Sequence, residues 1–374
     1  MLARRSFLKS VLSLTAGLGF SRGSCGFAET DSSSIDAQVE DYRSAYDVPG
    51  LSLAYGRGKE IILARAYGLA DRHDHHPVTT ESLFRIASLS KPITAAAVFT
   101  LVEAGKLRIG DSIFGPKGLL GSYSLRAHAD WLQAITVEHL LKHTAGGWSN
   151  KEHDPMFHET SLDHKAFIQR TLDAYPLEAK PGTAYNYSNF GYFLLGRVIE
   201  QVSGMPYGEY MRQHVQAPLG ISDMQLAGRK PAQNEVHYYG QGRDDPYAVP
   251  VELHDANGGW IATPIDLVHF ALGVFSARDK GGAPALFQLN TLDELTHGSH
   301  ANPEYGCGWS VSRYGDCSHS GGFDGSASFM MHRQDGLSWA VVVNTRRAHS
   351  EMENDLHKLC WDIEKMVRSS ISQL

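Results

Sequence analysis

Cysteine, basic clusters and long apolar runs are all scarce in this sequence. Four cysteines are spread over 374 residues without a repeated spacing, which excludes a disulfide framework as the basis of the fold. Beyond the first 28 residues no apolar run approaches about 18 residues, so no membrane-spanning helix is predicted there. The 34 Lys and Arg are outnumbered by 41 Asp and Glu. Because they form no basic cluster, neither nucleic acid nor an anionic membrane is an expected partner.

The first 28 residues have the composition of an export signal. Arg4 and Arg5 precede a short apolar run at residues 11–20, and small residues lead up to Ala28. This pattern resembles a bacterial twin-arginine signal, with cleavage expected after Ala28. An uncleaved membrane anchor is the alternative interpretation. The signal predicts a periplasmic or secreted protein whose mature chain is residues 29–374.

Strand and helix patterns alternate at the two ends of the chain. We expect helices at residues 34–46, 91–103, 136–143, 190–202 and 351–369, and strands at 50–55, 60–69, 305–311, 317–320, 327–332 and 338–344. Short turns between neighbouring strands favour antiparallel pairing. The sequence therefore predicts an α+β fold, an α/β sandwich in which helices flank an antiparallel sheet built from both terminal segments. The sheet lobe is expected at about 35–105 and 260–370, and an inserted helical lobe at about 106–260.

Ser88 and Lys91 form the first candidate site. A serine hydroxyl is a weak nucleophile until a base takes its proton, and a lysine one helical turn away can do so when burial favours its neutral form. Pro92 is typical of a first helical turn, which predicts exposed backbone N–H groups near Ser88 for the charge on an attacked carbonyl. The spacing alone is weak evidence, because Ser6 and Lys9 repeat it in the export signal.

Two further motifs occur once each in the chain, Tyr187-Ser188-Asn189 and His319-Ser320-Gly321. The order Ser-x-x-Lys, Tyr-x-Asn, His-x-Gly resembles the serine β-lactamase, penicillin-binding-protein and family VIII esterase superfamily, on its class C and DD-carboxypeptidase side. Other segments similar to signatures of that superfamily lie at residues 84–88, 140–146, 181–182, 258–263 and 305–309. The resemblance covers about residues 35–368, and it implies a β-lactamase/transpeptidase-like fold.

The resemblance also implies roles for the residues at the matching positions. Ser88 attacks the substrate and forms an acyl-enzyme, while Lys91 accepts its proton. Tyr187 shuttles protons to the leaving group and helps to activate the deacylating water, and Asn189 holds Lys91 and the substrate amide by hydrogen bonds. The third segment supplies His319, Ser320 and Gly321 along the cleft and Gly322, whose N–H joins that of Ser88 in the oxyanion hole.

The implied activity is that of an exported serine hydrolase that acts on an ester or amide bond without a cofactor. Three substrate classes remain open: peptidoglycan D-alanyl peptides, small carboxylic esters, and β-lactams or other amides. A penicillin-binding or sensor protein that is acylated without efficient turnover is the alternative, but intact Ser88, Lys91 and Tyr187 argue against it. An α/β-hydrolase is disfavoured because no Gly-x-Ser-x-Gly elbow occurs.

Two departures from the class C pattern affect substrate choice. His319 stands where those enzymes use a lysine beside the penicillin carboxylate, and Gly322 lacks the hydroxyl group often found after this motif in carboxypeptidases. Arg313 is either a substitute for the missing cation or a solvated turn residue. We therefore expect esters to be cleaved more readily than penicillins.

Histidine and cysteine could indicate a metal site or a disulfide. The histidine-rich loop at residues 72–76 lacks the ligand order of metallo-β-lactamases, and Leu140 stands between His139 and His143 where a zinc protease has glutamate. We expect solvated histidines and no metal. Cys307 and Cys317 either pair across a hairpin or are small core residues.

Overall fold

The computed structural model describes residues 29–121, 123–124, 129–151, 154–158, 163–241, 245–248, 250–279, 282–348 and 350–371. The predicted export signal, residues 1–28, lies outside these ranges. Within them, no helix combines the length and the apolar composition that crossing a membrane requires.

A seven-stranded antiparallel sheet forms the centre of the molecule. Its order is β3-β2-β1-β11-β10-β9-β8. The strands are β1 (Gly50–Arg57), β2 (Glu60–Asp71), β3 (His76–Pro77), β8 (Ser310–Val311), β9 (Cys317–Phe323), β10 (Ser326–His332) and β11 (Leu337–Val343). The N-terminal β1 pairs with the C-terminal β11, from Leu51 opposite Val343 to Arg57 opposite Leu337. The predicted sheet built from both ends of the chain is thus confirmed.

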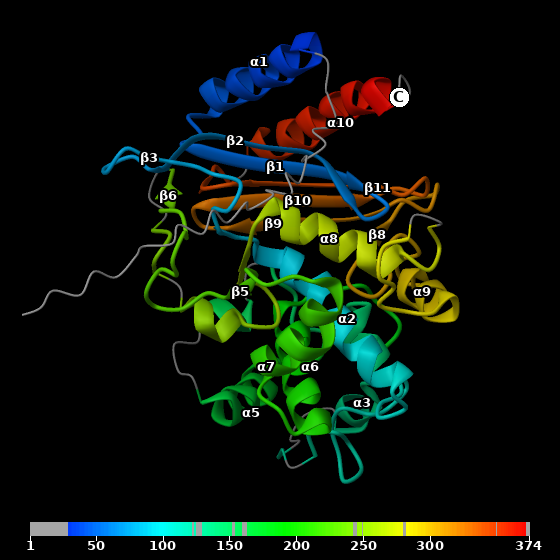
Figure 1. Cartoon of the computed structure of the whole chain (residues 1–374). Coiled ribbons are helices and arrows are strands. Elements are labelled where there is room, and N and C mark those ends of the chain that lie inside the picture. Colours follow the sequence, from blue (N-terminus) through cyan, green and yellow to red (C-terminus); the bar gives the residue numbers. More distant parts are fainter. Residues whose placement is uncertain are drawn as a thin grey trace, which may run out of the picture.

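Helices cover both faces of this sheet (Figure 1). The terminal helices α1 (Glu29–Tyr46) and α10 (Met352–Ile371) lie together on one face, and α8 (Pro264–Phe275) lies on the other. Every residue of β10 and β11 is buried, which explains why β11 is apolar apart from Ser338 instead of alternating.

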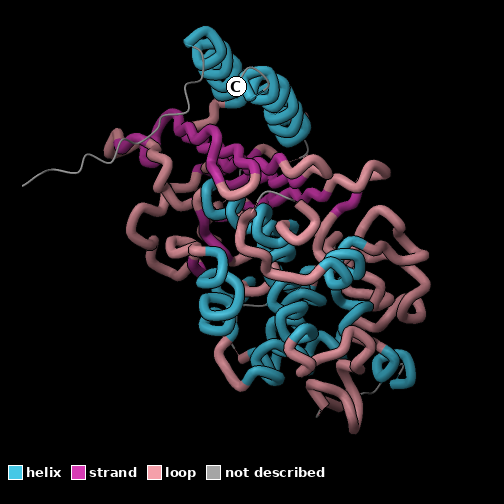
Figure 2. The backbone as a smooth tube through the Cα atoms, turned by 45° about the vertical axis from the view of Figure 1, so that its right-hand side comes forward, coloured by secondary structure: helices cyan, strands magenta, loops and turns pink. Residues whose placement is uncertain are grey.

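The remaining helices gather on the α8 side of the sheet, as Figure 2 also shows. They are α2 (Ser90–Glu103), α3 (Ala129–Ala134), α4 (Val137–Leu141), α5 (His164–Ala174), α6 (Asn189–Ser203), α7 (Tyr207–Met211) and α9 (Leu289–Thr296). Short strands form two further small sheets. One has the order β4 (Phe84–Arg85), β7 (Trp260–Ala262) and β5 (Gln225–Leu226), and the other pairs β12 (Thr345–Arg346) with β6 (Tyr239–Gly240).

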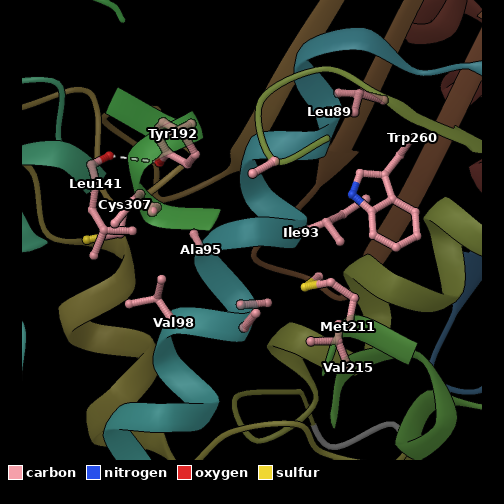
Figure 3. Packing of buried hydrophobic residues seen from close by; sticks show 14 of the residues in the cluster. Leu89, Ile93, Ala95, Val98, Leu141, Tyr192, Met211, Val215, Trp260 and Cys307 are labelled. Carbon is pink, nitrogen blue, oxygen red and sulfur yellow. Dashed lines mark hydrogen bonds between the residues drawn. The ribbon is translucent and has the colours of Figure 1, made fainter. Parts of the chain in front are cut away.

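Helix α2 runs through the middle of the hydrophobic core (Figure 3). Ile93 and Leu89 face Trp260 and Met211 on one side. On the other side, Ala95 and Val98 face the chain around Leu141. A helix that is apolar on all sides is stable only when it is enclosed. Its position is therefore fixed by packing around its whole circumference.

A 3₁₀ turn, Ala87–Leu89, precedes α2 and carries Ser88. Pro92 lies in the first turn of α2, where its missing N–H costs nothing, and Gly105 follows the helix at φ +67°. Ala87 has φ +47°, a left-handed conformation that is unfavourable for a residue with a side chain. This strained backbone turns the chain sharply immediately before Ser88.

The strand predicted at residues 305–311 is reduced to Ser310–Val311 in the structure. Gly306 lies so close to α9 that a Cβ there would be 2.5 Å from the carbonyl oxygen of Leu295, and Gly308 has φ +80°. This part of the chain packs against helices instead of pairing with a strand, which the alternating sequence pattern does not reveal.

Strand β9 approaches the Ser88 turn at Gly321. A Cβ added to Gly321 would lie 2.2 Å from the carbonyl oxygen of Ile86 and 2.3 Å from Oγ of Ser328. The Ser328 hydroxyl also donates a hydrogen bond to the Ile86 oxygen at 2.8 Å. The distance between the turn and the strand is therefore set by the absence of a side chain at position 321.

Gly321→Ala should lower the free energy of unfolding by about 1–3 kcal/mol, because the added methyl group forces the strand and the Ser88 turn apart. Urea unfolding measures this change. Gly110→Ala is the control, since a Cβ at Gly110 meets nothing within 4 Å. Equal stability of the two variants would show that the turn and the strand are not held in this close contact.

Candidate active site

Three separate segments bring the residues of the sequence motifs together. Ser88 and Lys91 come from the start of α2, Tyr187 and Asn189 from the chain entering α6, and His319 from β9. The α6 entry is fixed locally by Ser188, whose hydroxyl accepts a hydrogen bond from the N–H of Gly191 and caps the helix.

The Lys91 amine lies at the centre of this group and is completely buried. Its Nζ is 3.0 Å from Oγ of Ser88, 2.7 Å from Oδ1 of Asn189 and 2.9 Å from the carbonyl oxygen of Asn257. The two carbonyl-type oxygens can only accept hydrogen bonds, whereas a hydroxyl can also donate one. A neutral Lys91 therefore satisfies both carbonyls with its two N–H groups and directs its lone pair at Ser88.

Burial lowers the pKa of Lys91 to about 7, because an ammonium ion loses its hydration in this enclosed position. The Asp154 carboxylate acts in the opposite direction and raises the Lys91 pKa. Burial is the larger of the two effects. Near neutral pH a substantial fraction of Lys91 is thus unprotonated and able to accept a proton.

Asp154 fixes the orientation of the Asn189 amide. Its carboxylate accepts a hydrogen bond from Nδ2 of Asn189 at 2.6 Å and another from the N–H of Met156 at 2.9 Å. Because the amide nitrogen of Asn189 faces Asp154, its oxygen must face Lys91. Burial raises the pKa of the Asp154 carboxyl group, and these hydrogen bonds partly offset that effect.

Tyr187 packs beside the lysine, with Nζ of Lys91 4.8 Å from the centre of its ring. Burial raises the pKa of the Tyr187 phenol, and a hydrogen bond with Ser88 partly counteracts this increase. The phenol therefore keeps its proton at neutral pH. In this arrangement the unprotonated base next to Ser88 is Lys91, and Tyr187 is a hydrogen-bond donor.

A hydrogen-bonded chain of aromatic residues fixes the protonation of His319. The N–H of Ser188 donates to Nδ1 of His143 at 3.1 Å, so the proton of neutral His143 resides on Nε2, 3.2 Å from the Tyr305 hydroxyl. That hydroxyl in turn lies 3.1 Å from Nε2 of His319. Nδ1 of His319 donates to the Ser320 carbonyl oxygen at 2.7 Å. Nε2 of His319 is consequently an acceptor, and it lies 3.5 Å from the Tyr187 hydroxyl.

Burial, together with the nearby Lys91, lowers the pKa of His319 to about 3, and the hydrogen bond to the Ser320 carbonyl opposes this shift. The pKa of His143 is likewise far below its usual value because of burial. His319 therefore presents a neutral ring where the class C pattern has a cation. The prediction that His143 is a solvated helix residue is wrong, since it is 1% exposed.

The other predicted site residues of β9 are Ser320, Gly321 and Gly322, and each lies next to a different part of the protein. Gly321 faces the Ser88 turn, whereas the hydroxyl of Ser320 lies 3.2 Å from Nε2 of His357 in α10. A Cβ at Gly322 would meet the Arg346 guanidinium at 2.7 Å. Arg313 is exposed on the β8–β9 turn and donates to its neighbour Tyr314. It is a solvated turn residue.

Histidines and cysteines in the described part of the chain form neither a metal site nor a bridge. Groups of three or more His, Cys, Asp or Glu suited to a metal ion are absent from these residues. Cys307, Cys317 and Cys360 are buried and free. Of the two interpretations of Cys307 and Cys317, the structure supports small core residues.

Sequence reasoning missed three residues that shape this site. Asp154 belongs to no recognised motif, and nothing in its local sequence indicates a contact with Asn189. Tyr305 and Asn257 lie in or next to segments similar to family signatures, at residues 305–309 and 258–263. Those signatures could have identified both residues as candidates, although not their hydrogen-bond partners.

Comparisons with known proteins identify the family of the chain. The beta-lactamase family model matches residues 35–359. Esterase EstB of Burkholderia gladioli is 30% identical over 295 residues, which cover 72% of this chain and 70% of the esterase. Penicillin-binding protein 4* of Bacillus subtilis is 25% identical over 336 residues, covering 80% of this chain and 69% of that protein.

Solved structures show the same fold. D-amino acid amidase from Ochrobactrum anthropi SV3, complexed with L-phenylalanine amide, superposes with a TM-score of 0.75 at 23% sequence identity. The superposition covers 91% of this chain and 99% of the amidase. Together with the family model, which spans most of the chain, these similarities show that the chain belongs to the beta-lactamase family.

Proposed function

We propose that this protein is an exported serine hydrolase that cleaves an ester or amide bond through an acyl-enzyme on Ser88. The observation that carries the proposal is the buried Lys91 amine, 3.0 Å from the Ser88 hydroxyl, with its other two contacts made to oxygens that can only accept. A base held in this way has one free lone pair, and that lone pair faces the nucleophile.

Acylation begins when Ser88 attacks the substrate carbonyl and its proton passes to neutral Lys91. The carbonyl oxygen becomes negatively charged and is stabilised by the N–H groups of Ser88 and Gly322. The Ser88 turn and β9 are in van der Waals contact at Gly321, so the two donors belong to one rigid unit. A rigid arrangement of donors costs no reorganisation during the reaction.

The proton on Lys91 then passes to the leaving alcohol or amine through the Tyr187 hydroxyl. Tyr187 suits this role because it hydrogen-bonds with Ser88 and packs against Lys91. Deacylation repeats the sequence with water in place of the leaving group, so that Lys91 and Tyr187 each return to their starting protonation states.

The substrate class follows from the relatives and from the neutral His319 ring. An esterase, a putative D-alanyl-D-alanine carboxypeptidase and a D-amino acid amidase occur among the similar proteins, so esters and amides of small carboxylic acids are the candidates. The periplasm or the exterior of the cell is the proposed location, on the basis of the twin-arginine pattern in residues 1–28.

A fluorophosphonate probe should add one adduct mass to the wild-type protein, on the peptide that contains Ser88. Ser88→Ala should abolish the adduct, and Lys91→Ala should slow its formation by about 10²–10⁴-fold because the base is lost. Ser90→Ala is the matched control, since this hydroxyl contacts the Trp260 N–H and not Lys91. A label on another residue, or labelling of Ser88→Ala, would contradict the proposed function.

The rate constant kcat/KM should rise with pH through a limb near the Lys91 pKa of about 7, because only unprotonated Lys91 can accept the Ser88 proton. Asp154→Asn removes a negative charge that favours protonated Lys91, so the limb should move to lower pH. Ester hydrolysis measured from about pH 5 to about pH 9 tests the shift. Asp130→Asn, at an exposed position, should leave the limb unchanged. Movement of the limb to higher pH in Asp154→Asn would refute the assignment of Lys91 as the base.

A short-chain p-nitrophenyl ester should be hydrolysed faster than a chromogenic cephalosporin under the same conditions. The reason is that neutral His319 offers no charge to the carboxylate of a β-lactam. Steady-state rates on one protein sample decide between the two. Faster turnover of the cephalosporin would overturn this expectation without affecting the role of Ser88.

A further inference from the structure

A cluster of three rings lies beside Asn257, whose carbonyl oxygen accepts a hydrogen bond from Lys91. This aromatic cluster consists of Phe157, His254 and Phe323. The His254 ring is 5.3 Å from each phenylalanine ring, and the two phenylalanine rings are 6.2 Å apart, centre to centre. His254 is 1% exposed, whereas Phe157 is 50% exposed. The cluster therefore reaches the protein surface at Phe157.

The aromatic cluster is adjacent to the nucleophile. A Cβ at Gly258 would lie 3.7 Å from Cε2 of Phe323 and 3.9 Å from both the carbonyl carbon of Ala87 and Cβ of His254. One glycine thus separates the cluster from the residue before Ser88. A group bound at Ser88 is therefore close to the cluster.

Two polar atoms beside the cluster have no hydrogen-bond partner in the described part of the chain. Nδ1 of His254 lies 2.9 Å from Oδ1 of Asn257, and because that oxygen only accepts, Nδ1 carries the proton. Nε2 of His254 is left as an unpaired acceptor, and Nδ2 of Asn257 as an unpaired donor. Both atoms are buried, where an unpaired polar group is energetically unfavourable.

The chemistry of these two atoms selects the kind of ligand that fits. A carboxylate cannot donate to Nε2 of His254, and an ammonium group cannot accept from Nδ2 of Asn257. Lys91 is close enough to act electrostatically on the His254 ring, so its protonated form would also repel an ammonium group. An uncharged hydroxyl or secondary amide both donates and accepts, and it matches both atoms.

We propose that the aromatic cluster and Asn257 bind the acyl part of the substrate, and that this part combines an apolar or aromatic body with a neutral hydroxyl or secondary amide. The inference rests on the proposed acyl-enzyme at Ser88. Phe157 packs against the imidazole, and binding in this way requires its half-exposed ring to turn aside and admit the acyl group. The unpaired atoms then gain the hydrogen bonds that the protein itself does not supply.

Four methyl esters test the proposal on the complete mature chain: 3-phenylpropionate, 3-phenyllactate, N-acetylphenylalanine and N,N,N-trimethylphenylalanine, whose ammonium group is charged at every pH. Both enantiomers of each chiral ester are measured. Each kcat/KM is divided by the rate constant for hydrolysis of the same ester by hydroxide, which removes differences in intrinsic reactivity. The normalised values for the hydroxyl and acetamido esters should exceed those for the unsubstituted and ammonium esters by about 10-fold or more. This comparison requires no variant.

His254→Phe keeps an aromatic ring and removes the acceptor. The normalised preference for 3-phenyllactate over 3-phenylpropionate should then fall to about 1-fold. His300→Phe is the matched control, because His300 is exposed outside the cluster and its replacement should leave the preference unchanged.

Three results would overturn the inference: no preference in the wild type, a preference for the ammonium ester, or a preference that His254→Phe does not alter. Failure to hydrolyse all four esters while Ser88 still reacts with the fluorophosphonate would overturn it as well. Failure of the proposed function is distinguishable, because then the probe does not label Ser88 at all.

Discussion

A buried amine held between two oxygens that cannot donate is the constraint on which the rest of the site depends. Asn189 and the Asn257 carbonyl each require an N–H from Lys91, and burial disfavours a third proton on its nitrogen. The surrounding residues serve this arrangement. Asp154 orients the Asn189 amide. The N–H groups of Gly258 and Gly259 donate to the His254 carbonyl oxygen and hold the Asn257 turn.

The neutral ring of His319 changes the electrostatic character of the site. Tyr305 donates to this ring and the Ser320 carbonyl accepts from it, so both ring nitrogens are occupied without a charge. Lys91 is then the group whose protonation alters the local potential. On the proposed function, recognition of the substrate would depend less on an anionic group and more on shape and neutral hydrogen bonds, which the proposed binding role of the aromatic cluster supplies.

The general fold could be predicted from the sequence because apolar strands and an apolar helix have strong local signatures, whereas contacts between distant segments have none. Residues 136–143 illustrate the difference: their pattern predicted a helix with a solvated His143, but the helix ends at Leu141. His143 itself adopts φ +58°, which turns its ring towards Tyr187. The contact of Asp154 with Asn189 joins a loop to the first residue of α6, which only the tertiary fold brings together. Spacing and order identified the motif residues, but not the partners that fix their protonation.

The pairing of β1 with β11 has a consequence for biosynthesis. Strand β1, the first strand of the N-terminal hairpin, finds its second partner about 290 residues later in the chain. Such distant contacts form late because closing the intervening loop is entropically costly. A ribosome-bound chain that already displays Ser88 and Lys91 still lacks β9. On the proposed function, hydrolytic competence is therefore acquired only when synthesis is nearly complete, and a prematurely terminated chain carries Ser88 without the strand that completes the site.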